Sequence, residues 1–481
     1  MAMKPMSFES RVKRAGSEGF FCSIGQGVFK RLWLGQLVYC LAGTMAGADF
    51  WVTGYYPGYE QSRMRVSEID LGPMTHIIHF AAIVKADAGL DLTSLNLNSA
   101  AAAELIQKTH LLGKKVIVCV GGAGSEAGFQ SATTAAKLPT FIQGLTNLVA
   151  QRGYDGVDLD WEPLADSDAS QFTQLVVSLR ASLNRLSPSK LLTSAVEPFP
   201  QYGDSPTAHY SLFAQLQNQF DQLNVMTYDI SGPWPGWVTW HNGCIFDGGF
   251  RFPSTGGLLP SADGSIHRFL AQGLKPGKLG LGMGFYGVVW SGGTGFTQPR
   301  QPWADNDPPK VSTETFATIA TSYLRPEVYH WDTNAQAAYL SLTNGIRSQD
   351  EFISYEDERA CQAKISYARN HQLGGLMIWE LAQDYLPSKP QGHRHPLVGA
   401  IAQGLATPGT LSARKEAGRI WISFTAIPSG VYALEYSNDL GSHDWTTLSV
   451  TQFRDTVGTL VLPGDAVSQN VHRFYRVRTP P

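Results

Sequence analysis

Charged side chains are scarce in this sequence. They make up 16% of its 481 residues, below the roughly 25% that is usual for soluble domains. The 37 basic and 40 acidic residues nearly balance and leave a formal net charge of −3 at pH 7. Because proteins that bind nucleic acid use an excess of basic residues to neutralise phosphates, this balance argues against a nucleic-acid partner.

Cysteines and long apolar runs are scarce as well. Only Cys119, Cys244 and Cys361 follow residue 49, and their odd number and spacing match neither a disulfide framework nor a zinc site. No uninterrupted apolar run after residue 49 reaches the ~18 residues needed to cross a bilayer, so we expect no membrane span in the mature chain. The fold must therefore depend on a hydrophobic core, for which 43% of hydrophobic residues is enough.

Aromatic residues, by contrast, are abundant. They reach 11%, with 12 Trp, 18 Tyr and 23 Phe, which argues against disorder. A large aromatic core accounts for them most simply. Aromatic rings also form flat, rigid contact surfaces for ligands, and both interpretations stay open at this point.

The first 48 residues have the organisation of a secretory signal. Lys30 and Arg31 precede an apolar stretch over 32–45, and the small residues Ala-Gly-Ala follow at 46–48. The alternative is a buried N-terminal helix, but the character of the chain changes sharply at Asp49. We therefore predict a leader over 1–48, cleavage before Asp49 and a secreted protein.

Residues 49–408 alternate between short apolar runs and helix-like stretches. The runs predict buried strands at 50–56, 75–82, 115–121, 154–161, 191–196, 222–227, 278–285 and 374–379. Helices are expected at 100–112, 138–151, 169–186, 211–220, 265–273 and 357–371. This order predicts an α/β fold, a (β/α)8 TIM barrel. An open doubly wound sheet is the alternative, but no Gly-rich phosphate turn follows the first strand.

Two further segments interrupt or follow this pattern. Residues of about 288–350, between the seventh and eighth strands, predict an inserted small α+β subdomain, with a disordered lid as the alternative. After residue 408 the sequence changes to short alternating strands at 419–424, 431–436, 445–450, 459–462 and 473–477. We predict a C-terminal all-β sandwich over 409–481.

The segment 154–162 carries three acids with a spacing of two. In a strand Asp158, Asp160 and Glu162 share one face, while the apolar residues between them face the helices. Carboxylates confined inside a barrel cannot all ionise, so at least one pKa is expected to rise, as a general acid requires. A solvated strand face conflicts with the buried neighbouring strands, and a calcium loop needs a different order of acids and glycine.

The sequence Asp-Gly-Val-Asp-Leu-Asp-Trp-Glu at 155–162 resembles the D-G-x-D-x-D-x-E signature of family 18 glycoside hydrolases, the chitinase family. Segments at 54–57, 226–229, 285–287 and 374–380 resemble the family's first, sixth, seventh and eighth barrel strands in order. The resemblance covers about residues 50–405. It implies a (β/α)8 barrel and retaining hydrolysis assisted by the substrate's own acetamido group, an exception to the usual scheme of two carboxylates.

Four residues take catalytic roles by this resemblance. Glu162 would protonate the glycosidic oxygen and later activate water. Asp160 would orient the acetamido group and stabilise the oxazolinium ion, while Asp158 would share a proton with Asp160. Tyr228 would donate a hydrogen bond to the acetamido carbonyl.

The resemblance also implies a set of substrate-binding residues. Asp229 and Tyr286 would hold the sugar and Trp379 would form the floor under it, although a Trp here also suits an ordinary barrel core. The complete set is Trp379, Asp229, Met226, Tyr286, Tyr55 and Trp234.

Two positions depart from the family pattern. Cys119 occupies a place where many members have Ser near the inner Asp, and because a thiol is the weaker donor we expect a different pH profile. Ala123 occupies a place where many members have a Trp that stacks on a sugar, which argues against a long processive cleft.

The resemblance therefore predicts a secreted chitinase that acts on chitin or N-acetylglucosamine oligosaccharides. An endo-β-N-acetylglucosaminidase or a peptidoglycan or spore-wall hydrolase of the same family remains as an alternative. A lectin without catalysis is a further alternative, but such proteins usually lose the acid found here as Glu162. We expect a monomer that uses no cofactor and no metal.

Overall fold

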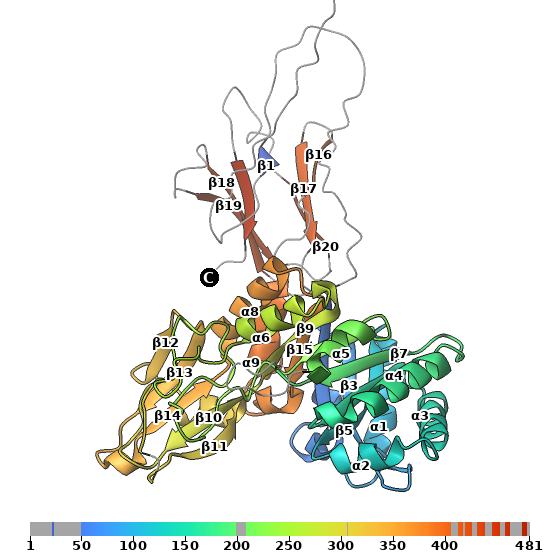
Figure 1. The fold of residues 1–481 in the computed structure, drawn as a ribbon. Helices are drawn as coiled ribbons and strands as arrows, with labels where there is room; N and C mark the ends of the chain where they lie inside the picture. Colours follow the sequence, from blue (N-terminus) through green and yellow to red (C-terminus); the bar gives the residue numbers. More distant parts are fainter. Residues whose placement is uncertain are drawn as a thin grey trace, which may run out of the picture. The chain divides into compact units, whose positions relative to one another are not determined.

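The computed structural model describes residues 22–23, 50–198, 208–304 and 306–405, and six C-terminal segments at 412–416, 419–425, 431–437, 445–452, 457–461 and 474–478 (Figure 1). The chain forms two compact units, Ala46–Gly404 and a second one made of Met1–Met45 and Leu405–Pro481. Except for Cys22 and Ser23, the predicted leader lies outside the described residues. Among the helices of the described ranges, none is long and apolar enough to cross a bilayer.

Eight parallel strands form a closed barrel in the first unit. They are β2 (Trp51–Pro57), β3 (His76–Val84), β5 (Lys115–Ala123), β6 (Gly156–Glu162), β7 (Leu191–Val196), β8 (Gln222–Val225), β9 (Leu279–Gly284) and β15 (Gly375–Trp379). Each strand pairs with the next in the chain, and β2 pairs with both β3 and β15, which closes the ring. A two-residue strand, β4 (Leu90–Asp91), pairs antiparallel with the end of β3. The predicted barrel is confirmed.

The six predicted helices are present around the barrel. They are α1 (Ala100–Leu111), α3 (Leu138–Arg152), α4 (Ala169–Leu183), α5 (Ala208–Leu216), α6 (Ala262–Ala271) and α8 (Glu358–Asn370). In α4 the apolar residues at positions 172, 175, 176, 179 and 183 are all buried, as expected for a helix with one face on a sheet. In the described part of the barrel, the helices α2 (Glu126–Ala132) and α9 (Pro396–Leu405) were not predicted.

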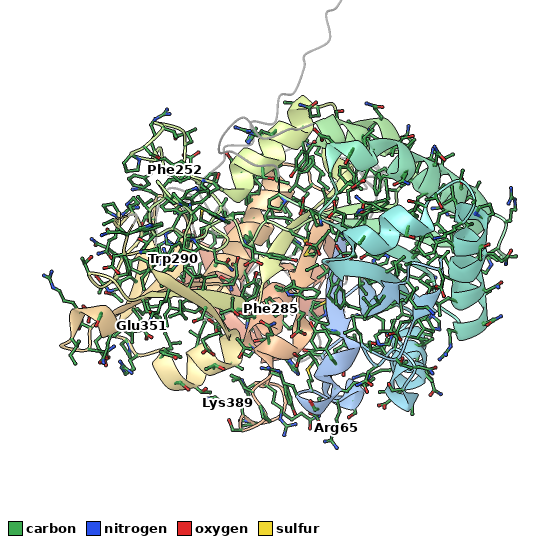
Figure 2. The ribbon with its side chains drawn as sticks, turned by 60° about the horizontal axis from the view of Figure 1, so that its bottom comes forward. Arg65, Phe252, Phe285, Trp290, Glu351 and Lys389 are labelled. Carbon is green, nitrogen blue, oxygen red and sulfur yellow. The ribbon has the colours of Figure 1, made fainter. Side chains whose placement is uncertain are left out.

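The insertion forms an antiparallel sheet with the order β11-β10-β14-β13-β12. Its elements are β10 (Tyr286–Ser291), β11 (Lys310–Thr315), α7 (Phe316–Thr318), β12 (Tyr329–Asp332), β13 (Ala337–Leu342) and β14 (Glu351–Tyr355). The sheet therefore begins and ends a few residues outside the expected 288–350. Trp290 of β10 is buried, as is Phe285 just before that strand, whereas Arg65 and Lys389 are exposed at the surface (Figure 2).

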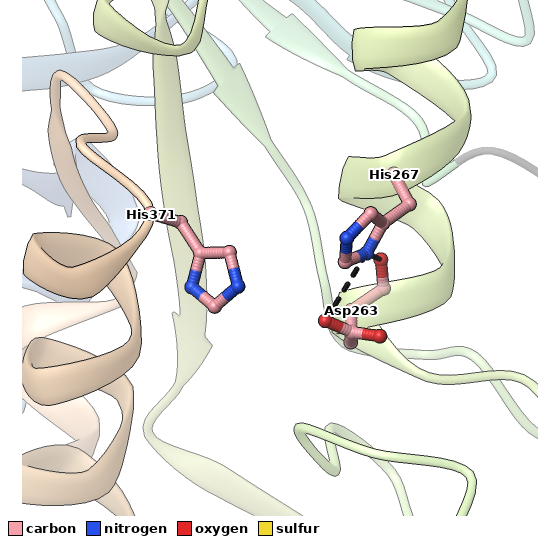
Figure 3. Close-up of side chains that lie close together, drawn as sticks. All are labelled: Asp263, His267 and His371. Atoms are coloured by element: carbon pink, nitrogen blue, oxygen red, sulfur yellow. Dashed lines mark hydrogen bonds and ion pairs between the residues drawn. The ribbon is translucent and has the colours of Figure 1, made fainter.

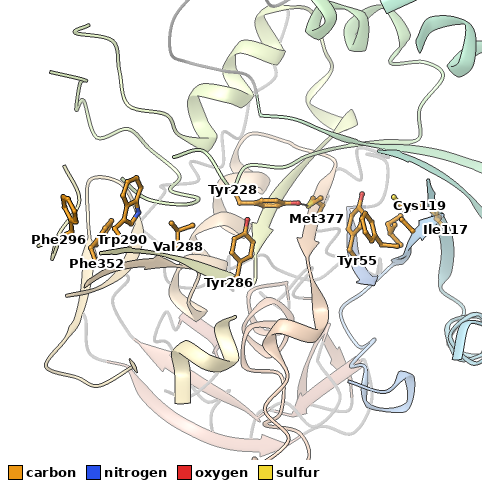
Figure 4. Close-up of a cluster of buried hydrophobic side chains, with 13 residues drawn as sticks. Tyr55, Ile117, Cys119, Tyr228, Tyr286, Val288, Trp290, Phe296, Phe352 and Met377 are labelled. Atoms are coloured by element: carbon orange, nitrogen blue, oxygen red, sulfur yellow. Dashed lines mark hydrogen bonds between the residues drawn. The ribbon is translucent and has the colours of Figure 1, made fainter. Parts of the chain in front are cut away.

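One aromatic cluster joins the insertion to the barrel. It runs from Phe296 and Trp290 through Tyr286 and Tyr228 to Tyr55 in the barrel interior (Figure 4). Because these rings form one buried cluster together with Val288 and Met377, the insertion packs against the carboxyl ends of the strands, where TIM barrels carry their active sites.

The second unit contains two antiparallel sheets. One contains β16 (Ser412–Glu416), β17 (Arg419–Thr425) and β20 (Val457–Val461). The other contains β1 (Cys22–Ser23), β21 (Phe474–Arg478), β18 (Val431–Ser437) and β19 (Thr446–Gln452). Five of these strands overlap the predicted ones, whereas β16 and β1, which falls in the predicted leader, were not predicted. Their arrangement as a sandwich stays a prediction.

Candidate active site

The three acids lie on one face of β6, as their spacing predicted. Asp158 and Asp160 are buried and Glu162, at the end of the strand, is partly exposed. On the opposite face, the Trp161 ring stacks on Phe129 of α2 with 4.7 Å between ring centroids. The alternation therefore points the carboxyl groups into the barrel and the apolar side chains toward the helices.

Asp158 is held by hydrogen bonds from two other strands. The Tyr55 hydroxyl of β2 donates to Oδ2 at 2.8 Å, and Thr193 Oγ1 of β7 donates to Oδ1 at 2.5 Å. Burial raises the pKa of Asp158 to about 6, although both donors stabilise the carboxylate and oppose that rise. Tyr55 was predicted among the substrate-binding residues, and its hydroxyl also holds this acid, whereas Thr193 was missed.

Asp160 and Glu162 are perturbed in the same direction. Burial raises the pKa of Asp160, and the negative charges of Glu162 and Asp158 raise it further. Burial also raises the pKa of Glu162. Ser125 fixes the backbone between these acids, because its hydroxyl accepts from Glu162 N and donates to Asp160 O, both at 3.1 Å. The site therefore retains protons on carboxyl groups at a higher pH than free carboxylic acids do.

Cys119 lies next to these acids on β5. Its Sγ is 4.0 Å from Oδ2 of Asp160, a long contact for a weak donor. Burial raises the pKa of the thiol well above its ordinary value, so Cys119 stays protonated at neutral pH and is not a nucleophile. Cys119, Cys244 and Cys361 are all free thiols.

Two glycines let β5 approach the acidic strand. Gly121 and Gly122 have φ values of 110° and 105°, which L side chains rarely adopt. A Cβ at Gly121 would lie 2.1 Å from the backbone oxygen of Asp160. Any larger residue there would therefore displace the strand that carries the acids.

An aromatic cleft with a volume of about 490 Å³ opens beside the acids. It is lined by Tyr55, Tyr59, Phe80, Ile83, Leu95, Gly121, Gly122, Ala123, Gly124, Ser125, Asp160, Glu162, Ala195, Met226, Tyr228, Asp229, Met377 and Trp379. The partly exposed Trp379 meets Phe80 and Tyr55 edge to face, with ring centroids at 4.8 and 5.7 Å. The cleft thus combines acids with flat apolar walls, which suits a neutral ligand that offers hydroxyl groups and stacking faces.

Asp229, which lines the cleft, lies beside Tyr286. Burial raises the pKa of Asp229, and the nearby Tyr286 hydroxyl opposes the rise. The Asp229 amide donates to Oδ1 of Asn242 at 3.0 Å, which holds the residue at a φ of 54°. Tyr228 lies close by, and its hydroxyl contacts Sδ of Met377 at 3.5 Å.

Trp234 is the exception among the predicted site residues. It is 48% exposed, packs against Trp237 with ring centroids at 4.5 Å, and is not among the residues that line the cleft. The other predicted residues come together in or beside the cleft or on the acidic strand. A sugar contact at Trp234 stays a prediction.

Reasoning from the sequence missed several polar neighbours. Besides Thr193, Ser125 and Asn242, the structure brings Glu197 to the end of β7, where burial and the charge of Glu162 raise its pKa to about 7. Thr193 has the same inward parity on 191–196 as the acids have on 156–162, and that signal was available. Nothing local to the sequence indicated Glu197.

The comparisons with known proteins agree with this geometry. The sequence model of Glycosyl hydrolases family 18 matches residues 52–384. Chitinase A1 of Niallia circulans is 28% identical over 297 residues, which are 56% of this chain and 40% of that protein. A probable endochitinase of Caenorhabditis elegans is 27% identical over 323 residues, covering 60% and 48%. The chain therefore spans about half the length of these relatives.

A solved structure shares the fold. The crystal structure of Ostrinia furnacalis Group IV chitinase in complex with allosamidin has a TM-score of 0.64 at 22% identity, and the match covers 74% of this chain and 99% of that one. The family match includes every strand of the barrel, the acidic strand and the cleft. Because it covers more than half of the sequence, the chain belongs to Glycosyl hydrolases family 18.

Proposed function

We propose that this protein is a chitinase that hydrolyses β-1,4-linked N-acetylglucosamine polymers or oligomers by substrate-assisted retaining catalysis. The observation that carries the proposal is the row of three acids on β6, with raised pKa values, facing an aromatic cleft. The chitinase names of the similar proteins support the substrate class, as does the allosamidin bound by the Ostrinia enzyme.

Bond cleavage would begin with a proton from Glu162. Its raised pKa favours the protonated form, and the carboxyl group lines the cleft, where a glycosidic oxygen can reach it. The acetamido oxygen of the sugar would attack the anomeric carbon as the leaving group departs, giving an oxazolinium ion. Asp160 would accept the acetamido N–H and Tyr228 would donate to the acetamido oxygen. Both residues line the same cleft as Glu162.

Hydrolysis of the oxazolinium ion would restore the enzyme. Glu162, now ionised, would remove a proton from water as the water attacks the anomeric carbon from the leaving-group side, so that configuration is retained. Asp158 would share a proton with Asp160 and so regulate the negative charge beside the oxazolinium ring. Its hydrogen bonds with Tyr55 and Thr193 fix the position from which it does so.

Glu162→Gln tests the acid directly. We expect turnover of a chitobiose or chitotriose reporter to fall by ~10²-fold or more, since general acid catalysis contributes that much. Binding of chitin oligosaccharides should persist, because the amide keeps the shape of the side chain. Glu327→Gln, at an exposed carboxyl of the insertion, is the matched control. Unchanged turnover in Glu162→Gln would refute the assignment.

Product analysis tests the substrate class. The protein is incubated separately with colloidal chitin, chitosan, peptidoglycan and a high-mannose glycoprotein, and soluble products are identified by mass spectrometry. We expect N-acetylglucosamine oligomers from chitin. Release of an intact N-glycan or of muropeptides, with none from chitin, would instead support the alternative substrates of this family.

We also propose export through the predicted leader. The basic and apolar pattern before Asp49 supports this, and the unit of the catalytic barrel begins at Ala46. The full chain and a variant without residues 2–48 would be expressed in a bacterial host. We expect the full chain to give an exported product whose N-terminal residue is Asp49. The truncated variant should give no exported product. Retention of the full chain in the cytoplasm would contradict it.

A further inference from the structure

We propose that Asp263, His267 and His371 form a zinc site that joins α6 to α8. This cluster lies outside the cleft and takes no part in the proposed catalysis. One ligand atom from each residue can be chosen so that all three lie within 4.8 Å of one another. Figure 3 shows the three side chains between the two helices, with His371 projecting toward the pair on α6.

The helices present these residues in a fixed arrangement. Asp263 and His267 are four residues apart on α6, so they occupy one face of that helix. Ser261 caps the start of α6, because its hydroxyl accepts from Gly264 N at 3.1 Å. His371 is the C-cap residue of α8. Two ligands therefore come from one helix face and the third from the end of its neighbour.

Hydrogen bonds set the tautomer of both histidines. Nδ1 of His267 lies 2.9 Å from the carbonyl oxygen of Asp263, and Nδ1 of His371 lies 2.9 Å from that of Tyr367. A carbonyl oxygen can only accept, so each Nδ1 carries the proton. Nε2 of each neutral ring then has its lone pair available, which is the arrangement usual for metal-binding histidines.

Tyr367 orients the carboxylate and the second imidazole at once. Its hydroxyl donates to Oδ1 of Asp263 at 2.8 Å, and its ring stacks on His371 with 4.0 Å between centroids. His267 also contacts Oδ1 of Asp263, at 3.2 Å. Both contacts use Oδ1, so Oδ2 is the oxygen that a metal would take. A ligand held by its own hydrogen-bond partner is characteristic of protein metal sites.

The donor set favours zinc. Two imidazole nitrogens and one carboxylate oxygen, with water in the fourth position, match the ligands that Zn²⁺ takes in tetrahedral sites. The His267 side chain is 58% exposed, so water reaches the site and the ring has room to close on the ion. Calcium and magnesium prefer oxygen ligands and are disfavoured by two imidazoles.

The location indicates a stabilising role. His371 precedes β15, which begins at Gly375, whereas Trp379 and the cleft lie at the other end of that strand. The N-terminal ends of TIM-barrel strands form the face that serves stability, and active sites lie at the opposite face. Zinc here would link the helices that lead into β9 and β15 without contacting the substrate.

Calorimetric titration of the full chain with zinc chloride, after removal of metals by a chelator, tests the site. We expect one saturable site with a dissociation constant in the micromolar range or below. His267→Ala and His371→Ala should each weaken binding by at least about tenfold, and Tyr367→Phe by about tenfold to a hundredfold, the usual effect of removing an outer-shell partner. His393→Ala, at an exposed histidine elsewhere, should bind as the wild type does.

Thermal unfolding provides the second measurement. Zinc should raise the unfolding midpoint of the wild type by roughly a few degrees, since a ligand that binds only the folded state stabilises it, and should not raise that of His267→Ala. Hydrolysis rates should stay unchanged with or without zinc. The proposal is overturned if the wild type shows neither saturable binding nor a shifted midpoint, or if both survive in the two histidine variants. Zinc binding and the unfolding midpoint are measured without substrate, so a failure to hydrolyse chitin would not change the outcome of this test.

Discussion

Asp158→Asn should make the protein more stable at neutral pH and less active. The buried carboxyl has a pKa of about 6 in the folded chain and an ordinary value of 3.8, so the folded state binds its proton more tightly than the unfolded state does. Stability from this group is therefore fully present below pH 3.8 and is lost as the pH rises toward 6. Asparagine cannot ionise and escapes that loss.

The magnitude follows from the two pKa values. The interval from 3.8 to about 6, at about 1.4 kcal/mol per pH unit, corresponds to about 3 kcal/mol at pH 7. The amide should also keep both hydrogen bonds. Its oxygen accepts from Tyr55, and its NH₂ group donates to Thr193, whose hydroxyl then becomes the acceptor. Turnover should fall, because an amide cannot share a proton with Asp160.

Urea unfolding of the barrel, followed by tryptophan fluorescence near pH 4 and near pH 7.5, measures this effect. We expect the free energy of unfolding of the variant to exceed that of the wild type by up to about 3 kcal/mol near pH 7.5, and by little near pH 4. Asp307→Asn, at an exposed carboxyl of the insertion, is the control and should show no such pH-dependent gain. An equal or lower stability of Asp158→Asn near pH 7.5 would refute the reasoning.

Two further perturbations test the barrel and the cleft. Lys364 and Glu356 form a buried ion pair. Lys364→Met should lower the free energy of unfolding by about 3–5 kcal/mol, because it leaves Glu356 as an unpaired buried charge. Urea unfolding measures this, and the double variant with Glu356→Leu should recover most of the loss. Trp379→Ala should raise KM for chitin oligosaccharides by about tenfold, since the exposed part of the ring lines the cleft, with Trp379→Phe intermediate in steady-state assays. A KM unchanged in both Trp379 variants would exclude this residue as a sugar contact.

The barrel was predictable because its signals are local. Each strand is a short, nearly continuous apolar run between helix-like stretches, and buried parallel strands have this pattern wherever they occur. The two missed helices lack such a signal. In α2 only Phe129 and Ala132 are buried, so its apolar period is too short to detect. The first turn of α9 is capped by Asp384, which accepts hydrogen bonds from Leu397 N and Val398 N. This cap lies 13 and 14 residues before those amides, so a search for a capping residue next to the helix does not find it.

Parity along a strand predicted which acids share a face, but not what surrounds them. Burial raises the pKa of Asp158, and Thr193 and Tyr55, which are 35 and 103 residues away in the sequence, limit the rise because closure of the barrel brings them to the carboxyl group. The Glu197 carboxyl likewise approaches Glu162 from a neighbouring strand. Electrostatic coupling of this kind follows from strand order and register, and those were unknown until the eight strands were paired.

The scarcity of charge and the abundance of aromatics have a common physical basis in this fold. Trp240 and Trp290 are fully buried, whereas Tyr59 is 42% exposed and lines the cleft with Trp379, so both interpretations of the aromatic residues hold for different rings. A cleft with such walls excludes water from the carboxyl groups beneath it and thereby raises their pKa values. The few acids placed there are destabilising on their own, and the same burial favours their protonated forms. The gain in stability expected for Asp158→Asn measures how much of this destabilisation Asp158 contributes.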